Sequence, residues 1–264
     1  MATVVFFHAH PDDEAIATGG TMALLADQGH RVVLVTATRG ELGEVPDGFL
    51  APGETLTDRR ERELAAACEV LGVTRQEFLG YRDSGMRGEP SNDDPGCFWR
   101  ADVEEAARRL ADLLVEEEAE VLTVYDEHGG YGHPDHVQVH RVGMRASELA
   151  GTERVFMSTM NRDHVRSLAE KAEEFGIAGQ ADFEARRADL DEFGTEAKHI
   201  TTAVDVTAHL GSKRRAMEAH ASQISETSFF LAMPPEAFEA VWGTEWYIRA
   251  GAQPLGAFEG SLLA

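Results

Sequence analysis

Two clusters of histidine and aspartate carry the side chains from which proteins build catalytic metal sites. One cluster follows an apolar run at residues 4–7, and the other follows an apolar run at residues 121–125. Their members are His8, His10, Asp12 and Asp13 in the first cluster, and His133, Asp135, His136 and His140 in the second. A catalytic zinc ion takes three ligands from histidine and carboxylate side chains and keeps a fourth position for water. These residue types therefore predict a hydrolytic metal site.

One set of three residues meets this requirement and leaves two groups for proton transfer. His10, Asp13 and His136 are the candidate ligands of a Zn²⁺ ion. Such an ion lowers the pKa of its bound water toward about 7 and polarises a carbonyl group. Asp12 would then take a proton from the water, and His133 would stabilise the oxyanion or protonate the leaving nitrogen.

Several other interpretations of the same residues stay open. His136 and His140 have the i, i+4 spacing of a helical metal pair, but the glutamate that zinc proteases carry beside the first histidine is missing. His8 is a candidate core histidine or an additional ligand, and Asp12 and Asp13 could instead merely begin a helix. Two histidines and a carboxylate also bind Fe²⁺ in oxygenases, so iron is the second candidate metal. No Gly-x-Ser-x-Gly motif or Cys–His neighbour suggests nucleophilic catalysis.

The elements that must position these residues follow from hydrophobic periodicity. Expected strands span 4–7, 31–38, 78–81, 121–125, 154–159 and 200–206, and expected helices span 15–28, 58–71, 101–118, 134–149, 209–220 and 235–242. Residues 161–198 are expected to be charged and helical, with a solvated face over 170–174. This alternation predicts an α/β fold whose mostly parallel sheet is covered by helices on both faces. In such sheets, ligands bind at the carboxyl ends of the strands, near a switch in strand order.

A phosphate-binding interpretation of Gly19 and Gly20 is disfavoured. The two residues would sit early in the helix over 15–28, but their spacing is not Gly-x-Gly-x-x-Gly. The carboxylates that precede them would also repel a phosphate group. We therefore do not expect a phosphate site at these glycines.

Composition excludes several classes of partner. The chain has 264 residues, enough for one domain over 1–264, and its formal net charge of −23 disfavours binding to nucleic acid or anionic membranes. Two cysteines are too few for a disulfide scaffold and favour reduced thiols in the cytoplasm. No leader segment or apolar run of membrane-spanning length is found. The oligomeric state is left open.

The residues also carry a resemblance to a known family. Residues 10–14 (HPDDE) and 133–136 (HPDH) resemble the two signature motifs of the PIG-L (LmbE-like) zinc-dependent N-acetylglucosaminyl deacetylases. Further segments are similar to the mycothiol-pathway members of that family, namely 40–45 (GELGEV), 63–72, 82–86 (RDSGM), 129–136 (GGYGHPDH) and 219–223 (AHASQ). The resemblance implies a Rossmann-like fold, with a core over 1–158 and a substrate-shaping part over 159–264. It also implies removal of acetate from an N-acetylated amino sugar.

The resemblance assigns roles to individual residues as well. It implies that His10, Asp13 and His136 bind the metal, that Asp12 is the general base and that His133 is the oxyanion or acid group. The additional residues are Tyr131, which would polarise the amide carbonyl, Asp135, grouped with the catalytic residues, and Arg60, Asp83 and Glu44, which would contact the substrate.

These observations predict a zinc-dependent N-deacetylase of a small molecule that contains N-acetylglucosamine. A mycothiol S-conjugate amidase using the same site is the alternative, and a silent sugar-binding module is a third interpretation. Binding alone needs no base beside a metal, which disfavours the third. Residues 160–200 and the C-terminus do not clearly resemble the corresponding segments of the family. Three substrates therefore stay possible: N-acetylglucosaminyl-inositol, a mycothiol S-conjugate, and an N-acetylglucosamine group on a secondary metabolite.

Overall fold

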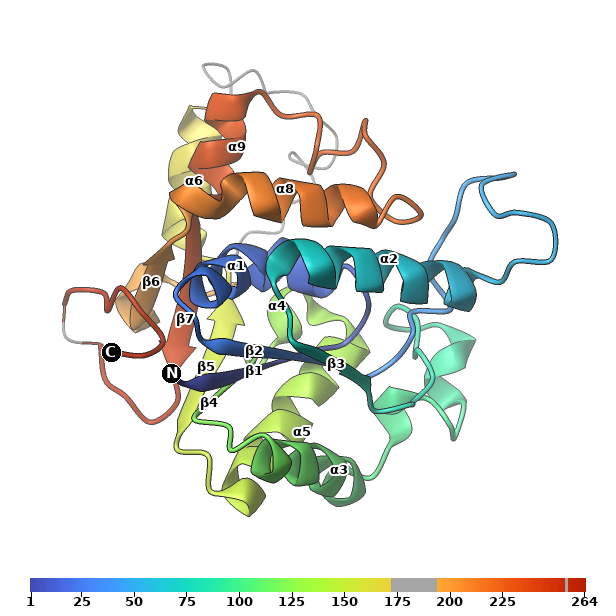
Figure 1. Cartoon of the computed structure of the whole chain (residues 1–264), viewed down its shortest axis with the longest axis horizontal. Helices are drawn as coiled ribbons and strands as arrows, with labels where there is room; N and C mark the ends of the chain where they lie inside the picture. Colours follow the sequence, from blue (N-terminus) through green and yellow to red (C-terminus); the bar gives the residue numbers. More distant parts are fainter. Residues whose placement is uncertain (172–193, 255) are drawn as a thin grey trace.

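A seven-stranded sheet forms the centre of the computed structural model, which describes residues 1–171, 194–254 and 256–264. The strand order is β3-β2-β1-β4-β5-β7-β6, and every pairing is parallel except those of β7 with β5 and β6 (Figure 1). The strands are β1 (Thr3–His8), β2 (Arg31–Thr36), β3 (Arg75–Phe78), β4 (Val121–Tyr125), β5 (Arg154–Thr159), β6 (Thr202–Asp205) and β7 (Thr244–Arg249). The predicted α/β fold with a mostly parallel sheet is confirmed.

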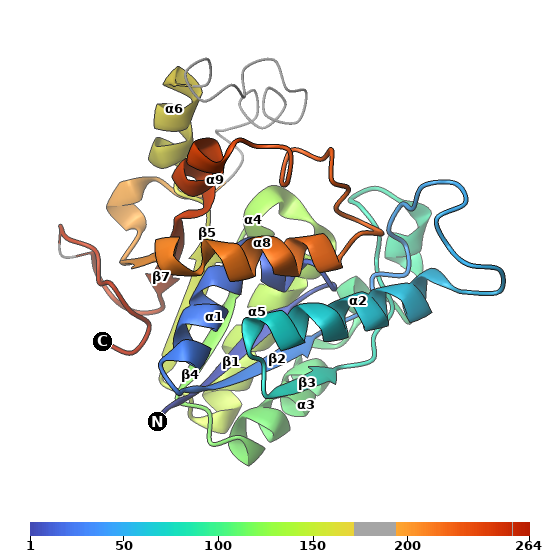
Figure 2. The ribbon, with the colours of Figure 1, turned by 45° about the horizontal axis from the view of Figure 1, so that its top comes forward.

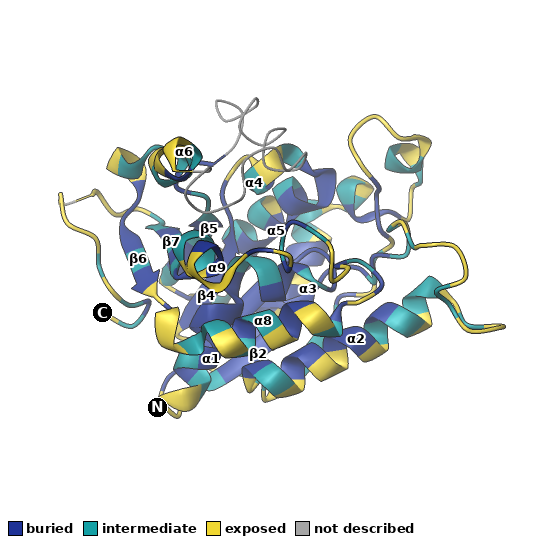
Figure 3. Cartoon of the chain, turned by 90° about the horizontal axis from the view of Figure 1, so that it is seen from above, coloured by how far each residue is buried: buried dark blue, intermediate teal, exposed yellow. Residues whose placement is uncertain are grey.

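Helices cover both faces of the sheet, so its central strands are apolar on both sides. In β1, the alternating side chains of Val4 and Phe6 pack with α1, α2 and α8, whereas those of Val5 and Phe7 pack with α3 and α5 (Figures 1 and 2). The helices are α1 (Gly19–Asp27), α2 (Leu56–Leu71), α3 (Val103–Glu116), α4 (Gly129–Gly132), α5 (Pro134–Ala150), α6 (Arg162–Glu170), α8 (Leu210–Ala219) and α9 (Pro235–Trp242). Figure 3 shows that α2 and α8 turn their exposed residues outward.

Shorter helical turns lie in the connections. They are a π-helical turn η1 (Glu14–Thr18) and the 3₁₀ turns η2 (Pro90–Asp93), η3 (Phe98–Arg100), η4 (Ala197–His199) and η5 (Thr207–His209). The π-helical turn directly follows the first predicted motif and leads into α1. Single π-turns of this kind occur frequently at functional sites.

A buried ion pair joins the C-terminal part of the chain to α1. The Glu245 carboxylate on β7 accepts hydrogen bonds from the main-chain N–H groups of Gly20 and Thr21, each at 2.8 Å. Lys213 on α8 donates to the same carboxylate at 2.6 Å. A Cβ atom on Gly20 would lie 2.5 Å from Val206, so a larger residue does not fit there. The start of α1 is thus neutralised by the chain's own carboxylate, in the way that helix N-termini bind anions.

Three elements differ from the expectations. The strand expected over 78–81 is wrong, because β3 spans Arg75–Phe78 as a half-buried edge strand in which charged residues replace the apolar pattern. The helix expected over 15–28 is divided into η1 and α1. β7 was not expected at all. Of the expected helical stretch over 161–198, α6 is observed, while 172–193 lies outside the described residues.

No helix among the described residues is long and apolar enough to cross a membrane. The proposed division into a core over 1–158 and a second part over 159–264 stays a prediction, although β6 and β7 of the second part extend the same sheet as the core strands.

Candidate active site

The two predicted motifs meet where the strand order reverses. The chain runs from β1 outward to β2 and β3 and then returns to place β4 on the other side of β1. His10 follows the end of β1, and His133 and His136 follow the end of β4. Ligand sites of open α/β sheets lie at such switch points, outside the carboxyl ends of the strands. The topology therefore brings together residues that are distant in sequence.

The three predicted metal ligands lie within contact distance around Asp13. Its Oδ2 atom is 3.4 Å from Nδ1 of His10, and its Oδ1 atom is 3.3 Å from Nε2 of His136. All three residues are buried. Nε2 of His136 is buried and makes no hydrogen bond within the described chain. An unsatisfied imidazole nitrogen beside a carboxylate fits the lone pair that a metal ion requires, so these residues fit a bound metal.

Additional groups near His10 could also serve as ligands. Nitrogen atoms of His10, His133 and His136 lie within 4.8 Å of one another, and so do ligand atoms of His10, Asp83 and Asp135. Nδ1 of the His10 ring faces Asp13, whereas its Nε2 atom faces Asp83 and Asp135.

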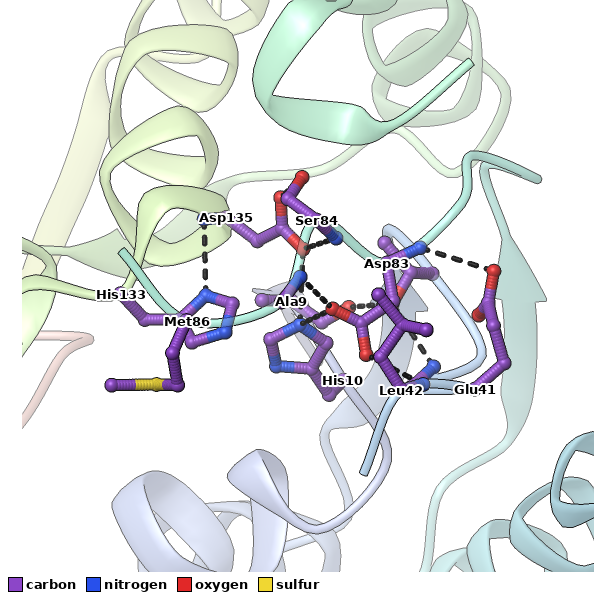
Figure 4. A network of polar contacts seen from close by, with 12 residues as sticks. Ala9, His10, Glu41, Leu42, Asp83, Ser84, Met86, His133 and Asp135 are labelled. Carbon is purple, nitrogen blue, oxygen red and sulfur yellow. Dashed lines mark hydrogen bonds and ion pairs between the residues drawn. The ribbon is translucent and has the colours of Figure 1, made fainter. Parts of the chain in front are cut away.

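The second nitrogen of His10 contacts buried carboxylates, as is usual for a histidine that binds a metal. Nε2 lies 3.1 Å from Oδ2 of Asp135 and 3.5 Å from Oδ1 of Asp83 (Figure 4). Although burial opposes protonation, Asp13, Asp135 and Asp83 raise the pKa of His10 well above its ordinary value. A cation at Nδ1 would occupy the same negative environment that favours this proton.

Asp135, in the first turn of α5, contacts both His10 and His133. Its carboxylate is fully buried and accepts hydrogen bonds from the main-chain N–H of Ser84, at 2.9 Å, and from the Ser84 hydroxyl. Its own main-chain N–H donates to Nδ1 of His133 at 3.1 Å. The Asp135 side chain thus orients His10, and its main chain orients His133. Its predicted grouping with the catalytic residues stays a prediction.

His133 caps the N-terminus of α5, where Pro134 occupies the first helical position. Because Nδ1 accepts the N–H of Asp135, a neutral His133 ring carries its proton on Nε2. Burial and the neighbouring His10 and His136 lower the pKa of His133 to about 4. The arrangement therefore presents a neutral N–H donor.

Asp12 has an unfavourable backbone conformation. Its φ of +101° lies in the region that residues with a Cβ atom rarely adopt. Its Oδ2 atom accepts a hydrogen bond from Arg60 at 3.1 Å. Burial raises the pKa of Asp12 to about 6, an effect that Arg60 opposes and Asp13 reinforces. Strained backbone of this kind is found frequently at active sites.

Arg60 connects the loop that follows β1 to the loop that follows β2. It lies on α2, whose start is fixed by a capping box between Thr55 and Asp58. Its guanidinium group donates to the carbonyl oxygen of Gly40 at 2.7 Å and to that of Pro11. Gly40 has a φ of +63°, and a Cβ atom there would lie 2.2 Å from the guanidinium group.

Asp83, Glu44 and Tyr131 differ in how far they are buried. Asp83 is buried, and its carboxylate accepts the N–H groups of Leu42, at 3.2 Å, and Gly85, at 2.9 Å. Although burial opposes the effect, contact with His10 and these N–H groups lowers the pKa of Asp83. Glu44 is exposed in the same loop as Leu42. Tyr131 is 46% exposed, with its ring centroid 4.9 Å from that of His136.

A cavity of about 770 Å³ opens beside Tyr131. Met86 contributes to its wall and lies beside His133 in Figure 4, on the opposite side of His10 from Leu42 and Glu41. The lining comprises Met86, Arg87, Asn92, Trp99, Glu127, His128, Tyr131, Gly132, Pro134 and Val137. The cavity borders the site through Tyr131, whose ring contacts those of His133 and His136.

Two alternative ligands do not face the cluster. His8 is buried and satisfied by Tyr125, at 2.8 Å from Nδ1, and by Thr18, at 2.8 Å from Nε2. Nδ1 of His140 lies 3.0 Å from the carbonyl oxygen of Tyr125. The interpretation of His8 as a core histidine agrees with this geometry, and His140 supports the strand end behind His136.

Sequence reasoning missed four residues that contact the site. They are Glu14 and His220, which touch each other, Ser84, which binds Asp135, and Tyr125, whose ring stacks on His136 at 4.3 Å. Glu14 lies in the HPDDE motif over 10–14, and His220 lies in the AHASQ segment over 219–223. Their place in these segments was the only indication in the sequence of a contact with the site. Pairing between residues so far apart has no signature in local spacing.

This chain is similar to a known protein family and to characterised relatives. The model of the family described as PIG-L: GlcNAc-PI de-N-acetylase matches residues 5–147, more than half of the chain. The 1D-myo-inositol 2-acetamido-2-deoxy-alpha-D-glucopyranoside deacetylase of Acidothermus cellulolyticus is 43% identical over 271 residues, which cover 97% of this chain and 92% of that protein. The similarity therefore extends through the later regions whose motifs gave no clear match.

Solved structures share the fold at lower identity. The N,N'-diacetylchitobiose deacetylase of Pyrococcus horikoshii is 22% identical, with a TM-score of 0.56 over 94% of this chain and 83% of that chain. GalB, the 4-carboxy-2-hydroxymuconate hydratase of Pseudomonas putida, is 19% identical, with a TM-score of 0.61 over 98% and 100%. A deacetylase and a hydratase thus share this fold, so the fold alone does not define the reaction. The family match and the 43% identity over nearly the whole chain show that it belongs to the PIG-L family.

Proposed function

We propose that this chain is a metal-dependent N-deacetylase that hydrolyses the acetamide of 1D-myo-inositol 2-acetamido-2-deoxy-α-D-glucopyranoside. The observation that carries the proposal is the unsatisfied Nε2 atom of His136 facing Asp13, with Asp12 and His133 beside it. This arrangement occurs in a chain 43% identical to a deacetylase of that substrate. The products are acetate and the free amine.

His10, Asp13 and His136 would hold the metal, with Zn²⁺ as the first candidate and Fe²⁺ as the second. A bound zinc ion lowers the pKa of water and polarises a carbonyl oxygen. Two imidazoles and one carboxylate suit either metal. The buried carboxylate of Asp135 at Nε2 of His10 would fix the orientation of that ring.

Asp12 accepts the proton from the attacking water in this proposal. Its neighbour Asp13 faces the metal position, whereas the positive φ of Asp12 directs its carboxylate to Arg60. Arg60 keeps the carboxylate in one orientation during the reaction. The proton taken by Asp12 is then available to the leaving nitrogen.

His133 donates a hydrogen bond to the oxyanion from Nε2. Since Nδ1 is bound to the N–H of Asp135, Nε2 is the nitrogen that offers a proton to the substrate. A neutral donor of this kind stabilises developing negative charge. The geometry thus favours the oxyanion role of His133 over the role of acid. Tyr131 would polarise the amide carbonyl from the open side.

The sugar would be held on the side of Asp83, Arg60 and Glu44. A neutral sugar is oriented by hydrogen bonds from fixed polar groups. Arg60 and Asp83 are buried and bound to main-chain groups, so they would fix the loop that carries Glu44 as well as face the substrate.

A mycothiol S-conjugate amidase is the second candidate. The cavity of about 770 Å³ on the His133 side could receive an acyl group larger than acetyl. We further propose a cytoplasmic location, since both cysteines are free and buried. A small-molecule amino sugar is the expected partner, with no nucleic acid or membrane.

The test is release of acetate or amine from the two substrates, with metal content measured on the same preparation. We expect turnover of the N-acetylglucosaminyl-inositol and much slower cleavage of an S-conjugate. Asp12→Asn should keep the metal and lose about 10²- to 10⁴-fold in turnover, the usual contribution of a general base. Faster cleavage of the S-conjugate would favour the amidase, and sugar binding without turnover would support the silent module.

A further inference from the structure

A buried pair links the C-terminal part of the chain to the catalytic turn. Nε2 of His220, at the end of α8, lies 2.6 Å from Oε1 of Glu14, and both side chains are fully buried. Since Glu14 is a carboxylate, the imidazole nitrogen donates and the oxygen accepts. Oε2 of Glu14 accepts the main-chain N–H of Asp12 at 3.0 Å. A continuous chain of hydrogen bonds therefore runs from α8 to the backbone of Asp12.

That backbone needs external support. Asp12 has a φ of +101°, which an L-residue leaves readily unless its surroundings determine it. Arg60 binds the side chain of Asp12 and the carbonyl oxygen of Pro11. The N–H group of Asp12 itself is held by Glu14. The contact with Glu14 thus acts on the main chain of Asp12, whereas Arg60 acts on its side chain.

Helix α8 holds the same turn at a second point. Lys213 donates to the carbonyl oxygen of Ile16, inside the π-helical turn η1, at 2.7 Å. Glu14 is the first residue of that turn. Lys213 in the first turn of α8 and His220 directly after its last turn therefore both bind η1, so a shift of this helix would move η1 and the Asp12 turn before it.

We propose that His220 and Glu14 are positioning residues that hold Asp12 in its left-handed conformation and thereby aim its carboxylate at the reacting water. This inference rests on the proposed role of Asp12 as the base. His220 fixes the rotamer of Glu14, and Glu14 fixes the N–H of Asp12. A misplacement of about 1 Å in a catalytic group can cost on the order of 10²-fold in rate.

The first experiment compares polar and apolar replacements at both positions. His220→Phe and Glu14→Leu keep side-chain bulk but remove the hydrogen bonds, so each should lower kcat roughly tenfold to a hundredfold with little change in KM. His220→Gln restores a donor, and Glu14→Gln can accept from Asp12 while donating to a neutral His220. Both amide variants should recover most of the kcat.

The matched control is Thr152→Val. Thr152 is also buried, and its hydroxyl donates a hydrogen bond to the carbonyl oxygen of Ala119 at 3.3 Å, without contact to α8 or η1. Its loss should lower stability without lowering kcat. If His220→Phe behaves like this control, or if Glu14→Gln is as inactive as Glu14→Leu, the positioning role is overturned.

Two additional readouts separate positioning from a general loss of structure. Metal content should stay at the wild-type level in His220→Phe, and a crystal structure of that variant should show Asp12 outside its positive-φ conformation. In an Asp12→Asn background, His220→Phe should cause little further loss of kcat, because residues that act through one group are not additive. Independent, additive losses would overturn the inference, whereas wild-type activity of Asp12→Asn alone would instead overturn the proposed function.

Discussion

Oδ1 of Asp13 lies 3.3 Å from Nε2 of His136, although the two residues follow different strands of the sheet. This nitrogen is buried and makes no hydrogen bond within the described chain. A buried polar atom without a partner costs free energy unless a bound group satisfies it. The contact therefore locates the position that a metal would occupy.

Replacing His136 should remove the metal without unfolding the chain. We expect His136→Ala to lose stoichiometric metal and turnover, because two of the three ligands bind far more weakly than three. His140→Ala is the matched control, one helical turn later on α5, and should keep its metal. Elemental analysis and circular dichroism of both variants test this. A full equivalent of metal in His136→Ala would exclude it as a ligand.

Removing the Asp83 carboxylate should impair catalysis for two reasons. It removes a proposed contact to the substrate, and it frees the loop around Leu42 that Asp83 binds. We expect Asp83→Ala to lower kcat/KM more than tenfold with unchanged metal content, since removing a buried hydrogen-bonding group costs about 1–3 kcal/mol. Asp94 is a suitable control, because it accepts the N–H of Gly96 two residues later, as Asp83 does with Gly85, but lies outside the site. Steady-state kinetics with Asp94→Ala should match wild type.

Stability should depend on pH through a charge cluster at the other end of the sheet. Contact with Arg31 lowers the pKa of Glu117 below its ordinary 4.5, burial opposes this, and Arg75 reinforces it. The stabilisation is therefore complete above pH 4.5 and is lost as pH falls through the lower folded-state pKa. Because Arg31 is more than a third exposed, we expect Glu117→Gln to cost only about 1 kcal/mol at pH 7.

Urea unfolding at pH 7 and pH 3 measures this difference. The gap between wild type and Glu117→Gln should shrink at pH 3. Glu116→Gln removes the same charge from a more exposed neighbour that also contacts Arg75, and should cost less. A gap that is equal at both pH values would show that Glu117 acts through packing.

The thiol of Cys68 should be inert in the folded protein. Cys68 is buried on α2, and burial raises the pKa of its thiol well above the ordinary value. Because thiolate is the reactive form, iodoacetamide should not modify Cys68 at pH 8 until guanidinium unfolds the chain. Peptide mass spectrometry reports each cysteine separately. Stoichiometric labelling of native protein at Cys68 would show that this part of α2 opens.

The sequence predicted the central strands and the meeting of the two motifs, because both depend on rules that act locally. Buried parallel strands are apolar throughout, and their carboxyl ends share one edge. The family prediction is confirmed as well. β3 was misplaced because Arg75 belongs to an edge strand, where one side is open to solvent and charge is tolerated.

Contacts between distant segments could not be predicted in this way. The pairing of His220 with Glu14 depends on how α8 packs on η1, and nothing in either segment specifies the other. The same holds for Arg60, which was expected to contact sugar and in the structure binds Pro11, Asp12 and Gly40. The individual roles of the site residues stay predictions.

The position of β7 has a consequence for the order in which the chain folds during synthesis. β7 spans Thr244–Arg249 and follows both β5 and β6 in the sequence, yet it lies between them in the sheet. Until the ribosome has released it, β5 has an open edge and β6 has no neighbouring strand in the sheet. An open edge can pair with another chain. An intermediate in which β7 has not yet paired therefore exposes the edge of β5, even though β1 to β5 can already pair.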